Sequence, residues 1–320
     1  MTRILITGAN GLIGTALVRL LLKLNDKDRK YHVIAGVRNK ERAKARYKKE
    51  LVRDDFEFLA GDVCDRNYLK DIDVDYIIHA GSPAHPKAFS ETPVETMETA
   101  ISGTRNILEY ARHNPVKGIV YISTGEIYGH AKLPDENGFT EDVQGLIDLS
   151  DPRSCYPESK RAAEVMCVSY AKEYDINVMI ARPGYIFGYE INPDNTRADS
   201  EFLRKVTCGE DIVLKSAGTQ LRSYMYVNDA AVAIMRILLS GEKGKAYNVA
   251  TYEKLTIREY AEKLAKAFGV GVGFDIPSSS EAAGYSKMKA EVLCPARLYE
   301  LGFEPEYTIE EAFREMKSLA

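Results

Sequence analysis

A chain of 320 residues is long enough for one large core or for two unequal lobes. Its composition, 45% hydrophobic and 28% charged, is that of an ordinary soluble globular protein. The net charge is −4 without a basic stripe, and no apolar run reaches about 18 residues, so we expect neither a nucleic-acid partner nor a membrane span.

Apolar runs of strand length alternate with helical stretches through the first half of the chain. The predicted strands cover residues 3–7, 32–37, 75–80, 118–124 and 178–182, and the predicted helices include residues 12–24 and 160–174. Such alternation indicates parallel strands joined by helical crossovers. The sequence therefore predicts an α/β fold with a doubly wound parallel sheet of the Rossmann type.

The pattern changes after residue 188, where strands become sparse. Helices are expected at residues 199–209, 228–239, 257–268 and 308–318, the last one opened by a capping box of Thr308 and Glu311. Residues 247–249 are expected to return to the main sheet. We thus expect a dinucleotide-binding domain at residues 1–188, with a sheet contribution from about 225–250, and a smaller, mainly substrate-binding lobe at 189–320.

The turn between the first strand and the first helix carries three glycines in a GxxGxxG spacing. Glycine permits the tight turn, lets the backbone approach a pyrophosphate and lets the helix pack close to the strand. The free N–H groups and the dipole of the helix N-terminus can then hold the phosphates. We predict that NAD or NADP binds here, through Gly8, Asn10, Gly11, Leu12, Ile13 and Gly14.

Two residues beyond the turn bear on the choice of cofactor. Arg38 follows the second strand, where an acidic residue would bind the ribose hydroxyls of NAD and an arginine can accommodate the 2′-phosphate of NADP. The sequence therefore favours NADP over NAD. Asp62 follows the next strand-like run and is expected to reach the adenine edge.

A Tyr-x-x-x-Lys pair, Tyr156 and Lys160, stands at the start of a predicted helix. Residues four apart share a helix face, about 6 Å along the axis. A nearby ammonium favours the phenolate, so we expect Lys160 to pull the Tyr156 pKa down from about 10 towards working pH. Tyrosinate could then take the proton from a sugar hydroxyl. The strand ending in Ser123 and Thr124 is expected to supply hydroxyls at the same mouth of the sheet.

The order of these motifs resembles the extended short-chain dehydrogenase/reductase family, the sugar-nucleotide epimerases and dehydratases. The resemblance rests on the glycine turn, Asp62-Val63, His79-Ala80-Gly81, Ser123-Thr124, Tyr156 with Lys160, Arg182-Pro183-Gly184, the loop 218–224 and the closing motif at 301–305. It implies a cytoplasmic enzyme, a homodimer, that binds NAD(P) and acts at C4 of a sugar nucleotide.

The resemblance also implies roles for single residues. Tyr156 would be the base, Lys160 would steady it and the nicotinamide ribose, and Ser123 or Thr124 would bind the reacting hydroxyl. Further cofactor contacts would be Val63, Ala80, Gly81, Ser82, Pro183, Tyr185 and Ile186, and further substrate contacts would be His85, Glu126, Tyr185 and Arg222, with Arg222 gripping the diphosphate.

Two departures from the family pattern limit what can be transferred. Gly125 stands where 4,6-dehydratases carry an aspartate and uronate decarboxylases a serine, whereas Glu126 keeps the glutamate place. Because the missing acid would have to come from elsewhere, such as Glu190 or His85, epimerisation or decarboxylation is favoured over 4,6-dehydration. Tyr185 and Tyr189 replace an Asn and a Pro, so the sugar cannot be read from the sequence.

Two alternatives stay open. An NADPH-dependent reductase of a keto-sugar nucleotide or another carbonyl compound would fit Arg38 and Gly125, and would consume its cofactor. A non-catalytic cofactor-binding regulator is disfavoured by the intact Tyr156 and Lys160 pair. The cysteines are five, scattered and without a CxxC pair, which is typical of a reduced cytoplasmic protein, and no His/Cys/Asp cluster has metal-ligand spacing.

Overall fold

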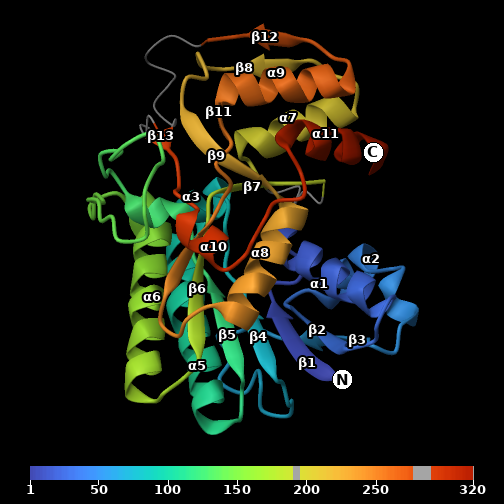
Figure 1. Cartoon of the computed structure of the whole chain (residues 1–320), viewed down its shortest axis with the longest axis vertical. Coiled ribbons are helices and arrows are strands. Elements are labelled where there is room, and N and C mark those ends of the chain that lie inside the picture. The colour runs from blue at the N-terminus through green and yellow to red at the C-terminus, as the bar shows by residue number, and fades with distance from the viewer. Residues whose placement is uncertain (190–194, 277–289, 320) are drawn as a thin grey trace.

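A seven-stranded parallel sheet forms the centre of the larger lobe (Figure 1). The computed structural model describes residues 1–189, 195–276 and 290–319. The strand order is β3-β2-β1-β4-β5-β6-β10, and every neighbouring pair is parallel. The strands are β1 (Thr2–Thr7), β2 (Tyr31–Val37), β3 (Phe56–Ala60), β4 (Tyr76–His79), β5 (Gly118–Ile122), β6 (Val178–Pro183) and β10 (Ala246–Val249). This confirms the predicted doubly wound fold, whose order reverses between β1 and β4 and opens a crevice there.

Helices cover both faces of this sheet, which explains why its strands are apolar throughout. Ile4 and Ile6 of β1 pack with α1 (Leu12–Asn25) and α8 (Val227–Ser240), whereas Leu5 packs on the opposite face with α5 (Thr104–His113) and α6 (Cys155–Glu173). Successive side chains of a strand point to opposite faces, so one apolar run serves two cores. The α6 helix begins at Cys155 rather than at residue 160, and Pro157 is tolerated in its first turn.

The smaller lobe contains more strands than the sequence indicated. The strand β9 (Leu221–Tyr226) pairs with β7 (Tyr185–Phe187), β11 (Lys254–Thr256) and β13 (Ala290–Glu291), and β8 (Ile212–Leu214) pairs with β12 (Val272–Phe274). Most of these strands have two or three residues, too few for an alternating pattern. The helices of this lobe are α7 (Ala198–Thr207), α9 (Ile257–Phe268) and α11 (Ile309–Leu319). In Figure 1 they lie above the carboxyl ends of the main strands.

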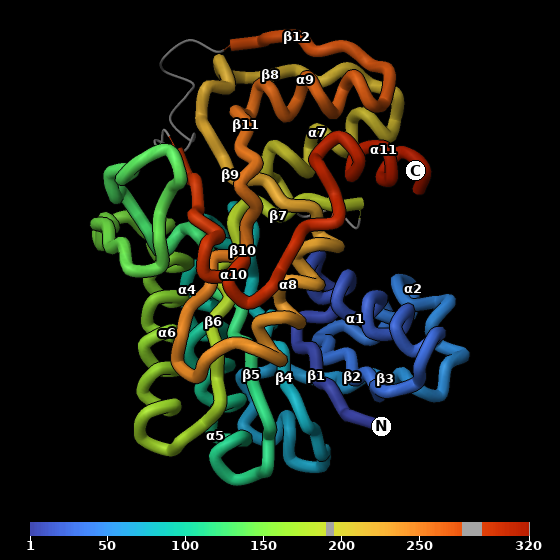
Figure 2. Tube along the Cα trace, viewed as in Figure 1, coloured from blue at the N-terminus to red at the C-terminus, as the bar shows by residue number. Residues whose placement is uncertain are grey.

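The chain passes between the lobes several times. After β9 it returns to the main sheet as α8 and β10, and after β13 it returns again as α10 (Ala296–Glu300), as Figure 2 shows. Arg297 of α10 donates a hydrogen bond from Nη1 to the Ala246 carbonyl oxygen of β10 at 2.9 Å. Short helices complete the larger lobe: α2 (Lys40–Arg46), α3 (Pro86–Glu91), α4 (Pro93–Glu98) and the turns Glu50–Val52, Thr99–Gly103, Gly125–Tyr128 and Pro152–Ser154. Both lobes therefore contribute walls to the crevice between them.

Candidate active site

A cavity of about 880 Å³ lies between the lobes and is lined by nearly all the residues singled out from the sequence. These are Gly8, Asn10, Gly11, Leu12, Ile13, Gly14, Arg38, Val63, Ala80, Gly81, Ser82, His85, Ser123, Thr124, Glu126, Tyr156, Lys160, Pro183, Tyr185, Ile186 and Arg222. Asp62 is the exception: it is exposed, and its Oδ1 accepts a hydrogen bond from the Cys64 backbone N–H at 2.8 Å. Glu190 lies outside the described residues.

The glycine turn forms a cradle that side chains would fill. Gly8 has φ +67°, and a Cβ there would lie 2.4 Å from the Ala80 carbonyl oxygen, while a Cβ on Gly14 would lie 2.4 Å from the Gly8 carbonyl oxygen. Gly11 caps α1 without a side-chain hydrogen bond, and the first turn of α1 carries no acidic residue. The backbone N–H groups in the first turn of α1 are thus available to an anion. The residues present fit the pyrophosphate of a dinucleotide.

The neighbouring strand end is held rigidly against this turn. The Gly81 N–H donates to Thr7 Oγ1 at 3.0 Å, and Thr7 Oγ1 is also 2.8 Å from His79 Nδ1. Burial lowers the pKa of His79 to about 3, so its ring is neutral at working pH. His79 therefore positions the loop through Ala80 and Gly81. At the outer end of the cavity, Arg38 Nη1 forms an ion pair with Glu95 Oε1 at 2.9 Å.

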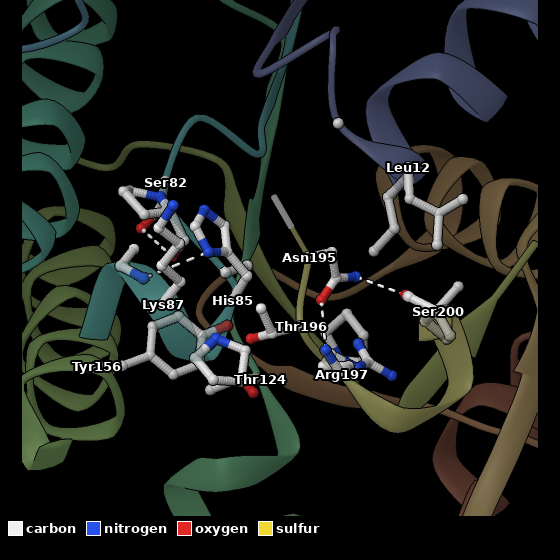
Figure 3. Close-up of a pocket in the computed structure, with 18 of the residues that line it drawn as sticks. Leu12, Ser82, His85, Lys87, Thr124, Tyr156, Asn195, Thr196, Arg197 and Ser200 are labelled. Atoms are coloured by element: carbon white, nitrogen blue, oxygen red, sulfur yellow. Dashed lines mark hydrogen bonds between the residues drawn. The ribbon is translucent and has the colours of Figure 1, made fainter. Parts of the chain in front are cut away.

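Tyr156 lies deep in the cavity beside Thr124, as Figure 3 shows. Its ring stacks on Phe89 with 4.3 Å between the centroids. Burial raises the pKa of the Tyr156 phenol, and the charge of Glu126 adds to this, while hydrogen bonding to Thr124 opposes it. The expected lowering of this pKa by Lys160 is therefore not found. Instead, Lys160 Nζ donates to the Ile122 carbonyl oxygen at 2.8 Å and lies over the Tyr121 ring.

Lys160 is itself unusual because its ammonium is buried. Burial lowers its pKa to about 7, against the opposing charge of Glu164. Its Nζ is 5.9 Å from the centroid of the Tyr156 ring. Lys160 and Tyr156 are thus buried near each other in the wall of the same cavity.

The segment after β5 supplies polar groups to the same wall. Ser123 Oγ is buried and has no hydrogen-bond partner within the described residues. Thr124 Oγ1 accepts from the Glu126 N–H at 3.2 Å and caps the next turn. Glu126 Oε2 pairs with Arg153 Nη1 at 3.0 Å, and Arg153 also lines the cavity. No sequence motif marks Arg153, whose role follows only from the fold.

Arg222 reaches the cavity from β9 in the smaller lobe. It is 2% exposed, and its Nε has no hydrogen-bond partner in the part of the chain that the structure describes. Its guanidinium and that of Arg197 each lie 4.9 Å from the centroid of the Tyr185 ring. Arg197 pairs with Asp199 at 3.1 Å. Because its Nε lacks a partner within the described residues, Arg222 is suited to receive an anionic ligand group.

A carboxylate that the sequence did not indicate stands next to Gly125. Glu291 of β13 is 3% exposed and lines the cavity. It lies opposite Arg222 in the register of β13 and β9. Its Oε1 would be 2.9 Å from a Cβ on Gly125. His85, by contrast, sits at the cavity edge and caps α3, where its Nδ1 accepts from the Ala88 N–H at 3.3 Å.

Comparison with known proteins shows the family of the chain and its fold. A sequence model described as the NAD dependent epimerase/dehydratase family matches residues 4–250. UDP-glucuronic acid decarboxylase 6 of Arabidopsis thaliana is 33% identical over 262 residues, 82% of this chain and 73% of that protein. UDP-glucuronic acid decarboxylase 1 of Danio rerio is 31% identical over 310 residues, 97% of this chain and 70% of that protein. The crystal structure of Thermus thermophilus UDP-glucose 4-epimerase with NAD has a TM-score of 0.78 at 25% identity, covering 99% and 98% of the two chains. The family match includes Tyr156, Lys160 and Arg222 and ends before Glu291.

Proposed function

The chain belongs to the NAD dependent epimerase/dehydratase family, and we propose that it oxidises a sugar nucleotide at C4 of the sugar with a recycled nicotinamide cofactor. We further propose that the reaction proceeds by decarboxylation of a UDP-uronic acid, with C4 epimerisation as the second candidate. The observation that supports this most strongly is that Ser123, Thr124 and Tyr156 face the cavity that also contains the glycine cradle. A hydroxyl bound to these groups would lie within the same enclosed space as the cofactor.

In this proposal the glycine turn holds the pyrophosphate, and Lys160, Pro183 and Ile186 line the nicotinamide end. The bound oxidised nicotinamide would accept a hydrogen with its electron pair from C4. Tyr156 takes the proton of the C4 hydroxyl, while Ser123 and Thr124 orient that oxygen. Burial raises the Tyr156 pKa, and the positive charge of Arg197 opposes that rise, whereas the Lys160 ammonium is bound to the Ile122 carbonyl oxygen.

The smaller lobe would hold the remainder of the substrate. Arg222 is proposed to bind the diphosphate, since a guanidinium fork matches phosphate oxygens and its Nε lacks a partner within the described residues. Tyr185, between Arg197 and Arg222, would contact the sugar. A ketone at C4 can take the electron pair that a departing carboxyl group leaves at C5. Besides the oxidation at C4, decarboxylation therefore requires only a proton for C5. Relatives at 31% and 33% identity are UDP-glucuronic acid decarboxylases.

Arg38 supports a finer proposal, a preference for NADP over NAD. Arg38 and Glu95 are each about half exposed at the cavity mouth, so the ion pair between them can open to admit a 2′-phosphate. The same residue favours the alternative of an NADPH-dependent reductase of a keto-sugar nucleotide. A reductase would consume cofactor in proportion to product, whereas a decarboxylase or epimerase would not.

We also propose a homodimer in the cytoplasm. Val165 and Val168 lie three residues apart on α6 and are 66% and 44% exposed, which gives the helix an apolar outer strip for a second copy. All five cysteines are free thiols, as in a reducing compartment. In the described part of the chain, no helix combines the length and apolarity needed to cross a membrane. Light scattering of the purified protein tests the dimer.

Incubation with a panel of sugar nucleotides tests the proposed reaction. The protein with NAD or NADP is mixed with UDP-glucuronate, UDP-glucose, dTDP-glucose and GDP-mannose, and the products are analysed by mass spectrometry and chromatography. We expect loss of carbon dioxide from UDP-glucuronate with the cofactor oxidised at the end. Rapid loss of water from a neutral sugar would instead show a 4,6-dehydratase, and cofactor consumption equal to product would show a reductase.

A further inference from the structure

Gly125 has no side chain, and a carboxylate from a distant strand lies where one would begin. A Cβ on Gly125 would lie 2.9 Å from Glu291 Oε1 and 3.2 Å from Leu293 Cδ1. Gly125 stands between Thr124 and Glu126, which both line the cavity. The Glu291 carboxylate thus occupies the space of a side chain at position 125, although it reaches that space from β13.

The surroundings of Glu291 suit a group that gains and loses a proton. Burial raises its pKa to about 7, and the charge of Glu126 adds to this. Arg222 from β9, hydrogen bonding to Tyr185 from β7 and Arg197 before α7 act in the opposite direction. A carboxyl that titrates near neutrality can serve as acid or base at little cost in driving force.

Glu291 also acts on the group that starts the proposed chemistry. The negative charges of Glu126 and of Glu291 both raise the pKa of Tyr156. Glu291 and Tyr156 also line the same cavity. A substrate whose C4 hydroxyl meets Tyr156 would therefore lie in the cavity that Glu291 lines.

We propose that Glu291 is a second acid–base residue of this cavity and that it delivers a proton to C5, the carbon next to the one that Tyr156 serves. The proposal rests on the proposed function. Once C4 is a ketone, the bond from C5 to the carboxyl group breaks, carbon dioxide leaves, and the electron pair becomes a C4 enolate. The carboxylic acid of Glu291 then gives its proton to C5 as the C4 carbonyl reforms. Glu291 remains as a carboxylate and regains a proton from water.

A purely structural role for Glu291, as counter-charge to Arg222, makes a different prediction. Its loss would weaken substrate binding and raise KM while leaving the pH profile and the proton step unchanged. The acid–base role instead predicts a fall in kcat and the loss of one ionisation. The isosteric change Glu291→Gln separates the two, because the amide keeps hydrogen bonding but does not ionise.

The test uses rapid mixing of the protein and its oxidised cofactor with UDP-glucuronate in D₂O. We expect Glu291→Gln to form reduced cofactor at nearly the parental rate, and to slow deuterium incorporation at C5 and product release by about 10²- to 10⁴-fold, the usual range for an acid–base group. The ionisation that Glu291 contributes to the parental pH profile should also be absent. Parental product formation and pH profile in Glu291→Gln would overturn the proposal.

The matched control moves the carboxyl group from position 291 to position 125. Glu291→Ala empties the space beside Gly125, and the double variant Gly125→Asp with Glu291→Ala returns a carboxylate to it from the other backbone position. We expect the double variant to recover part of the C5 protonation that Glu291→Ala loses, with both variants still binding dinucleotide. No recovery in a folded double variant would contradict the proposal. A parental protein that neither reduces cofactor nor alters any sugar nucleotide would instead contradict the proposed function.

Discussion

Replacing Glu291 by glutamine should change how the stability of the protein depends on pH. Burial raises the pKa of Glu291 from its ordinary 4.5 to about 7, so between these values the folded protein holds a proton that the unfolded chain has released. The stability contribution of this group is therefore fully present below pH 4.5 and is lost as pH rises to about 7. The glutamine side chain of the Glu291→Gln variant does not titrate, so the variant does not lose this stability as pH rises.

The magnitude follows from the pKa difference. A rise from 4.5 to about 7 at about 1.4 kcal/mol per pH unit corresponds to on the order of 3 kcal/mol for this 3% exposed group. The unfolding free energy of Glu291→Gln minus that of the parent should grow by this amount between pH 4.5 and pH 8. The measurement is denaturant unfolding of both proteins across that pH range. The difference between the two unfolding free energies removes the pH-dependent contributions that both proteins share, such as that of Lys160.

Glu259 provides a control of opposite sign. Hydrogen bonds from the Thr256 backbone and side chain lower the pKa of Glu259 in the capping box of α9, so its contribution is present above pH 4.5 and lost as pH falls. The unfolding free energy of Glu259→Gln relative to the parent should therefore decrease as pH rises towards 4.5, so the unfolding series is extended below pH 4.5 for this control. A pH-independent difference for Glu291→Gln, beside the expected trend for Glu259→Gln, would refute the reasoning about the buried carboxyl.

Three further substitutions probe the proposed site. Tyr156→Phe removes the proton acceptor and should lower turnover by about 10²- to 10⁴-fold, with dinucleotide binding measured by fluorescence nearly unchanged. Arg222→Ala should weaken nucleoside-diphosphate binding by about 1.5–3 kcal/mol in calorimetry, the range for a hydrogen bond to a charged group. Arg38→Asp should reverse the preference from NADP to NAD in cofactor titrations, because a carboxylate repels the 2′-phosphate and binds ribose hydroxyls.

Control variants and contradicting outcomes test these three substitutions. Tyr174→Phe, at the far end of α6, should keep parental turnover, and equal behaviour of the two tyrosine variants would remove Tyr156 as the base. Arg258→Ala changes an exposed arginine paired with Glu262 and should leave binding intact. Unaltered affinity of Arg222→Ala for UDP, dTDP, CDP and GDP would exclude Arg222 from the site. A parent protein that binds NAD more tightly than NADP would contradict the role of Arg38.

Features encoded in neighbouring residues could be predicted from the sequence. The glycine turn can be recognised from the spacing of its glycines between a strand and a helix. In the structure, a Cβ on each of these glycines would lie close to backbone atoms. The helix predicted at residues 257–268 has these bounds in the structure, because its apolar spacing is local; the capping box of Thr256 and Glu259 was not predicted. The parallel direction of the main strands follows from the alternation of strands and helices, whereas their order does not.

Features that depend on tertiary contact could not be predicted. Glu291 belongs to a two-residue strand, and nothing in the surrounding sequence shows that its carboxyl group lies next to Gly125. Arg153 reaches Glu126 only because two loops meet. The expectation for Tyr156 was wrong for a related reason: spacing placed Lys160 on the same helix face, but burial outweighs a charge whose ammonium is bound to the Ile122 carbonyl.

The central claim is that Tyr156 accepts the proton of the C4 hydroxyl while a bound nicotinamide would accept the C4 hydrogen and later return it. The most direct measurement uses UDP-glucuronate deuterated at C4, with the product analysed by mass spectrometry and NMR. We predict that the label slows the formation of reduced cofactor and is found at C4 of the decarboxylated product. A product that carries solvent hydrogen at C4, or one formed without any reduced cofactor and without an isotope effect, would contradict the claim.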